Sequence, residues 1–381
     1  MRFELDDLHA SIQQNAREFA QKEVRPQAVC WDQAEEMSTQ IVKKVGDMGF
    51  WGIRLPEEYG GAGLDTLAYS IVVEEIGRED GSLGLSVAAH NGLGSSHIAT
   101  FGSEELKKKY LPKLASGEYL GAWALTEPSS GSDAAGSMQT RAIKQDKQWL
   151  LNGSKQFITH GASAGVCVVM AVTDPSKKQK GITAFAVEKG TPGFTVSQHL
   201  KKLGMRACET VELSLENVAL DDSQRVGELN SGFIDTLKIL DTGRISIASL
   251  ALGLGEGALQ RAISYAKERE QFGKTIANFQ AIQWMIANSR TKLDAARLLT
   301  WKAASLADQG KPYTNEAAMA KLYASEAATE ACNHAIQIHG GYGYTREYVV
   351  ERHLRDAKLC EIGEGTSEVQ RMVIAKNILR K

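Results

Sequence analysis

The chain has few residues of the kinds that bind metals or cross-link small folds. Only five cysteines occur, none of them in a CxxC pair, and the eight histidines show neither HxxxH nor HExxH spacing. An odd number of scattered thiols argues against a disulfide framework, and the missing ligand spacings argue against a zinc site. The sequence therefore predicts reduced thiols and no bound metal.

An excess of one charge and long apolar runs are missing as well. The 44 Lys and Arg against 46 Asp and Glu leave a formal net charge of −2, which favours neither nucleic acid nor an anionic membrane as a partner. No apolar run approaches the roughly 20 residues that cross a bilayer. The N-terminal stretch, MRFELDDLHASI, is acidic and lacks the basic character of a targeting segment. We expect a cytoplasmic protein.

Two familiar phosphate-binding motifs are also absent. There is no Walker A sequence, and no GxGxxG opens a helix after a strand. The nearest approach, Gly340-Gly-Tyr-Gly343, follows a helix-like stretch. A Rossmann dehydrogenase is therefore disfavoured, whereas other cofactor sites remain open.

What is present divides the 381 residues into three stretches, as suits two or three packed domains. Apolar residues recur at helical spacing over residues 1–118, short β-branched and aromatic runs occupy 119–224, and long Ala-rich helical patterns fill 225–381. The sequence thus predicts an α+β fold, with a helical N-terminal domain, a small antiparallel β domain and a C-terminal helical bundle.

One local signal refines the middle domain. Asn152-Gly153 lies between two of the β-like runs. A type I′ turn requires positive φ at both central positions, which these two residues tolerate, so the pair predicts a hairpin.

Long helices are expected over 237–270, 276–309 and 315–339. The first contains three glycines, each of which costs a helix about 1 kcal/mol relative to alanine. They indicate either the close approach of another backbone or a break in the helix. These glycines are Gly253, Gly255 and Gly257.

The loop Leu125-Thr-Glu-Pro-Ser-Ser-Gly-Ser-Asp133 concentrates polar groups. It holds four hydroxyls and two carboxylates within nine residues. Such a loop can offer hydroxyls and backbone N–H groups to the polar edge of a heterocycle. The alternative is a solvated connector between domains.

A second stretch, EIGEGTSEVQR, places Glu364 between Gly363 and Gly365. It is either an exposed turn or a site where the backbone approaches something flat that the acid must touch, because glycines avoid a Cβ clash. Ser367 with Gln370 fits a capping box, so a helix is expected to follow. The helix dipole favours the ionised acid and burial favours the neutral one; the sequence leaves that balance open.

Five motifs in order along the chain carry a resemblance: ALTEPSSGSD, KQFITHG, REQFGKTIANFQ, QIHGGYGYTREY and EIGEGTSEVQR. Together they strongly resemble the acyl-CoA dehydrogenase family. Three further segments most resemble the short-chain and branched-chain branches of that family: SVAAHNGLGSSHI, LPKLASGEYLGAWALTEP and KLGMRACET. The resemblance implies a helical N-terminal domain, a middle β-barrel and a C-terminal four-helix bundle.

The resemblance also implies an activity. A member of this family binds FAD non-covalently and forms homotetramers. It removes an α proton and a β hydride from an acyl-CoA thioester, here a short- or branched-chain one, to give a trans-2-enoyl-CoA. Its electrons pass to electron-transfer flavoprotein.

By motif position, the resemblance assigns residues to roles. Glu364 is the catalytic base, and the substrate contacts are Ser132, Asp241, Arg244 and Gly365. The group from Arg269 to Gly341 is implied to reach the cofactor largely across a subunit interface. The positions implied for FAD are Trp123, Leu125, Thr126, Ser132, Phe157, Ile158, Thr159, Arg269, Gln271, Phe272, Phe279, Gln280, Gln337, Gly340, Gly341, Thr366, Ser367 and Glu368.

The proposed chemistry requires a base in this position. The α proton of a thioester is weakly acidic, so its removal needs a positioned carboxylate whose pKa burial can raise. Isovaleryl-type members carry their base on the segment that matches Leu240-Asp-Thr-Gly-Arg244, where this chain has Gly243. Glu364 is therefore the base that the sequence offers. Arg244 alone reads as a surface or ion-pair residue, whereas the family match places it beside the substrate channel.

Some positions depart from the family pattern. Phe157 stands where Trp is common, His160 where Asn is frequent, Gly363 where Tyr is frequent, and Cys208 where Ser is usual. None removes a group that the chemistry requires, and Gly363 is expected to widen the pocket.

Residues 85–94 are expected to shape the acyl pocket. The stretch contains no arginine, which disfavours a dicarboxylic substrate. Its His90 is either a hydrogen-bonded core histidine or a polar contact to an unusual acyl group.

Other functions are possible on this fold. They are a flavoenzyme for another acyl-CoA (cyclic, aromatic or an enoyl-CoA that is reduced), a monooxygenase or reductase, and a non-catalytic member that binds nucleic acid. Glu364 argues against a monooxygenase, which needs no α-proton base. The mixed charge of the C-terminal half argues against nucleic acid.

Overall fold

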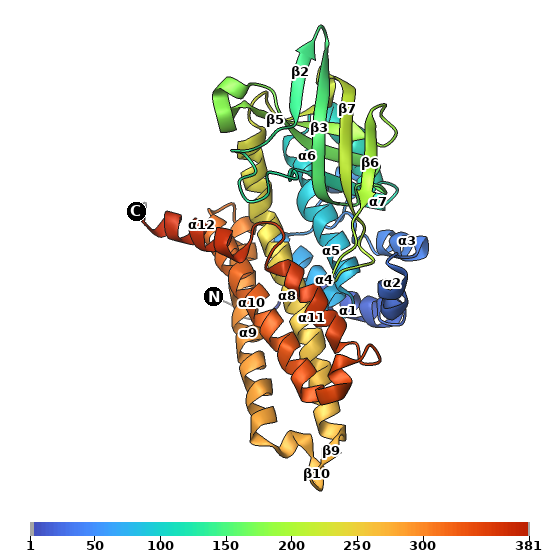
Figure 1. Ribbon diagram of the computed structural model, residues 1–381, viewed down its shortest axis with the longest axis vertical. Coiled ribbons are helices and arrows are strands. Elements are labelled where there is room, and N and C mark those ends of the chain that lie inside the picture. The colour runs from blue at the N-terminus through green and yellow to red at the C-terminus, as the bar shows by residue number, and fades with distance from the viewer. Residues whose placement is uncertain (1–3, 380–381) are drawn as a thin grey trace.

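The computed structural model describes residues 4–379. Figure 1 shows a β domain at one end of an elongated molecule, with helices from both ends of the chain packed together below it. The predicted α, β, α order is therefore confirmed. Residues 1–3 and 380–381 of the expected terminal domains lie outside the described residues.

Most of the N-terminal helices begin at a side chain that caps them. Asp65 accepts the Ala68 N–H at 2.8 Å, and Asp80 accepts the Leu83 N–H at 2.7 Å. These helices are α1 (Asp7–Phe19), α2 (Ala28–Ala34), α3 (Thr39–Asp47), α4 (Thr66–Gly77), α5 (Gly81–Ala89), α6 (Ser96–Phe101) and α7 (Glu104–Ser116).

The middle domain is an eight-stranded sheet with the path β6-β7-β3-β2-β4-β5-β8, to which β1 adds by pairing with β4. The sheet is mixed, because β1 runs parallel to β4 and β2 meets β4 in parallel at Arg141 and Val172. The predicted β domain is thus confirmed, although its pairing is not purely antiparallel. Its strands are β1 (Gly121–Ala124), β2 (Arg141–Gln145), β3 (Gln148–Thr159), β4 (Val166–Val172), β5 (Ile182–Glu188), β6 (Phe194–His199), β7 (Thr210–Asp221) and β8 (Arg225–Val226).

The hairpin predicted at Asn152-Gly153 is wrong. Both residues lie inside β3, where the register against β7 shifts between Leu151 and Gly153. Gly153 has a φ of +152°, and a Cβ there would meet Thr140. The glycine therefore permits a β-bulge with close packing rather than a chain reversal.

The C-terminal helices form a bundle. α8 (Gly232–Glu268) runs from beside the sheet to a small hairpin of β9 (Glu270–Gln271) and β10 (Lys274–Thr275) at the far end of the molecule (Figure 1). The remaining helices are α9 (Gln280–Asp308), α10 (Thr314–His339), α11 (Val350–Cys360) and α12 (Ser367–Leu379).

The glycines of α8 mark a close approach and not a break. The helix is continuous through all of them. A Cβ on Gly253 would lie 2.2 Å from the Glu74 carbonyl oxygen, and one on Gly257 would lie 2.1 Å from that of Arg78. They let α8 pack directly on the backbone of the α4 segment.

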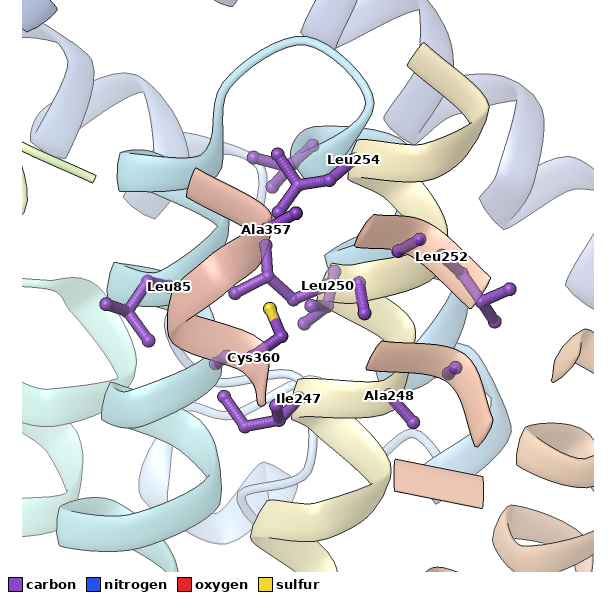
Figure 2. Close-up of a cluster of buried hydrophobic side chains, with 14 of the residues drawn as sticks. Leu85, Ile247, Ala248, Leu250, Leu252, Leu254, Ala357 and Cys360 are labelled. Atoms are coloured by element: carbon purple, nitrogen blue, oxygen red, sulfur yellow. The ribbon is translucent and has the colours of Figure 1, made fainter. Parts of the chain in front are cut away.

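The main core surrounds α8. Figure 2 shows Leu250, Leu252 and Leu254 of α8 with Ala357 and Cys360 of α11. All five side chains are buried. Since α8 is packed on several sides, the positions of residues 241–244 near its start are fixed, and these residues can form part of a site. Among residues 4–379, no helix combines the length and hydrophobicity required to cross a bilayer.

Candidate active site

Glu364 lies in the short loop between α11 and α12 and has an unusual backbone. Its φ is +54°, and that of Gly365 is +96°. A Cβ on Gly365 would lie 2.7 Å from Gln370 Nε2, so this position does need glycine. At Gly363 a Cβ would meet no atom of residues 4–379 closer than 3.5 Å, so the packing of the chain itself does not demand glycine there.

The Glu364 carboxyl group points toward α8. Its Oε2 is completely buried and has no hydrogen-bond partner among residues 4–379, although the residue as a whole is partly accessible. A Cβ on Gly243 would lie only 1.9 Å from this oxygen, so the carboxyl group rests against the glycine. Burial raises the pKa of Glu364 to about 7, against the opposing charges of Lys321 and Arg244. Burial thus outweighs the effects that favour the ionised form.

Arg244 and Asp241 flank Gly243 on α8. Arg244 is buried and donates to Asp241 Oδ1 at 2.5 Å, and Asp241 also accepts the Thr314 hydroxyl at 2.5 Å. Arg244 Nε is buried without a partner in the described chain. Burial lowers the pKa of Arg244 and raises that of Asp241. Arg244 is therefore not a surface residue, whereas the ion-pair part of that alternative is confirmed by its contact with Asp241.

The predicted capping residue of α12 is wrong by one position. Thr366 Oγ1 accepts the Val369 N–H at 3.3 Å, because Ser367 is already the first helical residue. Ser367 donates its own N–H to the Glu361 carbonyl at 2.9 Å. Ser367 is buried, Thr366 is half-buried and Glu368 is exposed.

Two residues that hold this loop were missed by the sequence reading. Lys321 of α10 is fully buried and donates to the Gly365 carbonyl at 2.7 Å. Gln370 is also buried, and its amide donates to the same carbonyl at 2.9 Å. The sequence does hold one indication of Lys321: it is the single lysine of the Ala-rich helix α10.

The polar loop after β1 is held by a buried ion pair. Lys155 Nζ lies 2.9 Å from Glu127 Oε1 and also donates to the Leu125 carbonyl at 3.1 Å. Glu127 in turn accepts the backbone N–H groups of Gln139 and Thr140. Burial lowers the pKa of Lys155 to about 8. The start of the loop is therefore part of the core and not a loose connector.

Other predicted residues of this loop differ in exposure. Trp123 donates its indole N–H to His97 Nδ1 at 3.0 Å and is half-buried. The Thr126 carbonyl accepts the Gln156 N–H at 2.8 Å, which ties the loop to β3. Ser132 is exposed.

The end of β3 presents an aromatic ring outward. Phe157 has a φ of +61° at a second register shift, and its side chain is 63% exposed. Ile158 is buried in the β core and Thr159 is half-buried. His160 also has a positive φ, and its Nδ1 lies 3.3 Å from the Gly121 carbonyl oxygen. Its Nε2 is buried and has no hydrogen-bond partner within residues 4–379.

His90 is a core histidine. It is fully buried, accepts the Gly121 N–H at Nδ1 (3.0 Å) and donates from Nε2 to the Leu114 carbonyl (3.1 Å). Burial lowers its pKa to about 3. Because both ring nitrogens are occupied, the alternative of a polar contact to an acyl group is not supported.

Eight of the 18 predicted cofactor residues lie elsewhere. The β9–β10 hairpin is at the end of the molecule opposite to the sheet (Figure 1). Arg269, directly after α8, lies over the Tyr342 ring at 5.6 Å, and Phe272 is 92% exposed. At about 1.5 Å per residue, Arg269 is about 38 Å from Arg244 along the helix. A single chain therefore does not bring these eight residues to Glu364. The eight residues are Arg269, Gln271, Phe272, Phe279, Gln280, Gln337, Gly340 and Gly341.

The order of domains, with a buried carboxyl group between the last two helices, defines a class of flavoprotein oxidoreductases. The sequence matches the profiles of the acyl-CoA dehydrogenase N-terminal domain over residues 6–118, the middle domain over 122–218 and the C-terminal domain over 230–379. The chain belongs to the acyl-CoA dehydrogenase family, and it is an FAD-dependent oxidoreductase that acts on acyl-CoA.

Several known proteins are similar over the whole chain. A probable acyl-CoA dehydrogenase of Bacillus subtilis, YngJ, is 49% identical, and a short-chain specific acyl-CoA dehydrogenase of Clostridium acetobutylicum is 46% identical; each match covers 100% of both chains. The CarC subunit of the caffeyl-CoA reductase–Etf complex of Acetobacterium woodii is 44% identical over 97% of this chain and 98% of its own. The butyryl-CoA dehydrogenase structure from Megasphaera elsdenii superposes with a TM-score of 0.97 at 41% identity, covering 100% of both chains.

The residues near the sheet fit FAD. Phe157 offers an exposed ring for packing against a flat heterocycle, and the buried Nε2 of His160 beside Thr159 has an unused hydrogen-bonding group. The loop from Leu125 to Ser132 offers backbone groups and hydroxyls at a position fixed by Lys155. These groups are the ones expected around a polar ring system that also has an apolar face.

Proposed function

We propose that Glu364 is the base that removes the α proton of a short- or branched-chain acyl-CoA. The observation that carries this proposal is the buried, unpaired Oε2 pressed against Gly243. A buried acceptor without a partner is costly, by about 1–3 kcal/mol, and is typical of a group that waits for a ligand. A carboxyl group with a pKa of about 7 is also well matched to proton transfer near neutral pH.

The other residues of the chain then orient the thioester. Asp241, Arg244 and Gly365 lie around the base and are proposed to contact the substrate, with Ser132 on the opposite loop. Bound FAD supplies the acceptor for the two electrons. The positive φ of Glu364 fixes the direction of its side chain, so the proton is taken at a defined carbon atom.

The test is Glu364→Gln, which keeps the shape and removes the base. The variant is expected to bind FAD normally and to lose α,β-dehydrogenation by a factor of about 10² to 10⁴, the usual contribution of a general base. Both proteins would be titrated anaerobically with a panel of acyl-CoA thioesters while flavin bleaching is recorded. Normal turnover by Glu364→Gln would show that another group is the base.

A second candidate function is the reduction of an enoyl-CoA. The similarity to the caffeyl-CoA reductase subunit, and to a 3-(aryl)acrylate reductase of Clostridium sporogenes, supports it. The same base would then return a proton to the α carbon. Adding enoyl-CoA thioesters to the dithionite-reduced protein distinguishes the two directions, since reoxidation of the flavin by an aryl but not by a short-chain substrate would favour the reductase.

We further propose how the protein assembles and where it acts. Arg269, at the β9–β10 end, is about 38 Å from Arg244 along α8. This separation from the base supports a site that a partner copy completes within a homotetramer. The names of relatives support electron-transfer flavoprotein as the redox partner. Residues 1–118, 119–224 and 225–381 are proposed as the three domains of a cytoplasmic enzyme, and analytical ultracentrifugation would test the tetramer.

A further inference from the structure

We propose that Lys321 is a positioning residue for the base: it holds the loop that presents Glu364 and places a positive charge beside the carboxylate. This inference rests on the proposed role of Glu364. Nothing in the comparisons assigns a role to Lys321, which is far from the motifs in sequence.

The first observation is the isolation of the Lys321 ammonium group. The side chain is 0% exposed, and its hydrogen bond in the described chain goes to the Gly365 carbonyl at 2.7 Å. No carboxylate of residues 4–379 lies within ion-pairing distance of it. Burying an ammonium without a directly bonded anion costs several kcal/mol, so such a lysine calls for a compensating charge nearby.

The second observation is the atom that Lys321 binds. Gly365 and Glu364 both have positive φ, and for Glu364, which has a Cβ, this conformation is unfavourable by about 1–3 kcal/mol. The bonds from Lys321 and Gln370 to one carbonyl, that of Gly365, hold the loop in this conformation. Gln370 alone could supply a donor, whereas only Lys321 supplies a charge.

The charges around the pair act in one direction for Glu364. Lys321 is the first of the two cations that oppose the effect of burial on its pKa, and Arg244 is the second. Burial lowers the pKa of Lys321 to about 8, against the attraction of nearby acidic groups. The groups that face the two residues are Arg244 from α8, Tyr69 from α4, Cys360 and Glu361 from the end of α11, and Glu368 from α12. Asp241 of α8 is paired with Arg244 and acts through it.

The sign of the effect follows directly. The pKa of Glu364 is raised above its usual value, so the base is protonated and inactive below about pH 7. Removing the Lys321 charge takes away an attraction for the carboxylate. The pKa of Glu364 therefore rises further, and the carboxyl group stays protonated up to a higher pH. We expect the midpoint to rise by about one pH unit, which lowers the ionised fraction of Glu364, and with it the rate, near pH 7 by about fivefold.

The experiment uses two neutral variants of the FAD-loaded enzyme. Lys321→Met removes the donor and the charge, whereas Lys321→Gln keeps a donor and removes only the charge. The control is Lys302→Met, which removes an exposed lysine of α9 that lies 3.7 Å from Glu316. The infrared carbonyl band of protonated Glu364, assigned by its loss in Glu364→Gln, would be titrated in each protein, together with kcat/KM against pH.

A rise of the infrared midpoint in both neutral variants, with no change in Lys302→Met, is the expected result. An unchanged midpoint, accompanied only by lower stability or lower FAD content, would reduce Lys321 to a structural residue. If a neutral variant does not fold, Lys321→Arg keeps the charge, so its midpoint must stay within about half a pH unit of the wild type; a larger shift overturns the proposal. The infrared titration does not depend on turnover, so failure of the proposed function, shown by an active Glu364→Gln, is recognised separately.

Discussion

At the scale of single residues, the position of the Glu364 carboxyl group depends on the absence of a side chain at Gly243. Gly243 leaves the space into which Glu364 Oε2 fits, and the part of α8 that follows it is buried in the core. Any side chain at position 243 and the carboxyl group at 364 therefore compete for one volume. This explains in physical terms why a base at one of these positions excludes a base at the other.

Gly243→Ala tests this competition. The added Cβ would lie 1.9 Å from Oε2, so the carboxyl group must move, and a displacement of about 1 Å can cost about 10²-fold in rate. Alanine is favoured over glycine within a helix by about 1 kcal/mol, so the variant should remain folded. The measurement is kcat/KM beside a thermal melt.

Gly363→Ala is the matched control, because its Cβ would meet nothing closer than 3.5 Å. It should retain the wild-type rate. Equal losses in the two alanine variants would mean that the loop, and not the contact with Gly243, determines the activity.

At the scale of elements, the loop after β1 and the strand β3 form one unit. Lys155 of β3 reaches back to Glu127 and to the Leu125 carbonyl, and the Gln156 N–H bonds to Thr126. The exposed ring of Phe157 follows directly on the same strand. The buried ion pair thereby sets the spacing between the polar loop and the aromatic ring that are proposed to enclose the flavin.

Glu127→Gln should break this unit. It leaves the Lys155 ammonium buried without a counterion, which typically costs about 3–5 kcal/mol. The double variant Glu127→Gln/Lys155→Met should be less destabilised than the sum of the two single changes, because each removes the same interaction. Urea denaturation and the ratio of FAD to protein measure both effects.

The control for that cycle is Glu18→Gln, which breaks the exposed pair of Glu18 with Lys22 in the first helices. An exposed pair of this kind contributes at most about 1 kcal/mol. A loss as small as this in Glu127→Gln, with FAD fully retained, would contradict the proposed role of the ion pair.

The elements also show what sequence reasoning can and cannot reach. Hydrophobic periodicity predicted the long helices to within a few residues, because a buried stripe repeats over many turns. Asn152-Gly153 was misread, since the glycine serves a contact with Thr140 that is distant in sequence. Lys321 was missed for the same reason: its partner at Gly365 is found only once α10 and the last loop are packed together.

At the scale of the whole molecule, the residues assigned to FAD fall into two groups, apart from Thr366, Ser367 and Glu368 beside the base. Those near the sheet lie on the same side of the molecule as α6 and the start of α8, whereas Arg269 and its neighbours are at the far end (Figure 1). Phe272 is 92% exposed at the hairpin tip, so its ring is available for contact with another molecule. Both observations fit a cofactor that is shared between copies.

Arg269→Ala tests the far group. A guanidinium that binds a pyrophosphate contributes about 1.5–3 kcal/mol, so the affinity for FAD should fall by about 10- to 100-fold and the protein should purify depleted of flavin. The visible spectrum of the purified protein reports the flavin content. Arg346→Ala, at another exposed arginine near the same end, is the matched control. Full flavin content in Arg269→Ala would remove this end of the molecule from the cofactor site.

The unbroken course of α8 limits how such a protein can change. The helix carries Gly243 near one end and leads into Arg269 at the other. Deleting one residue between them would turn the far end by about 100° and shorten the separation by about 1.5 Å. A single gap in this segment would thus shift Arg269 relative to Gly243, and under the proposed sharing of FAD between copies it would disturb a site in each of two subunits.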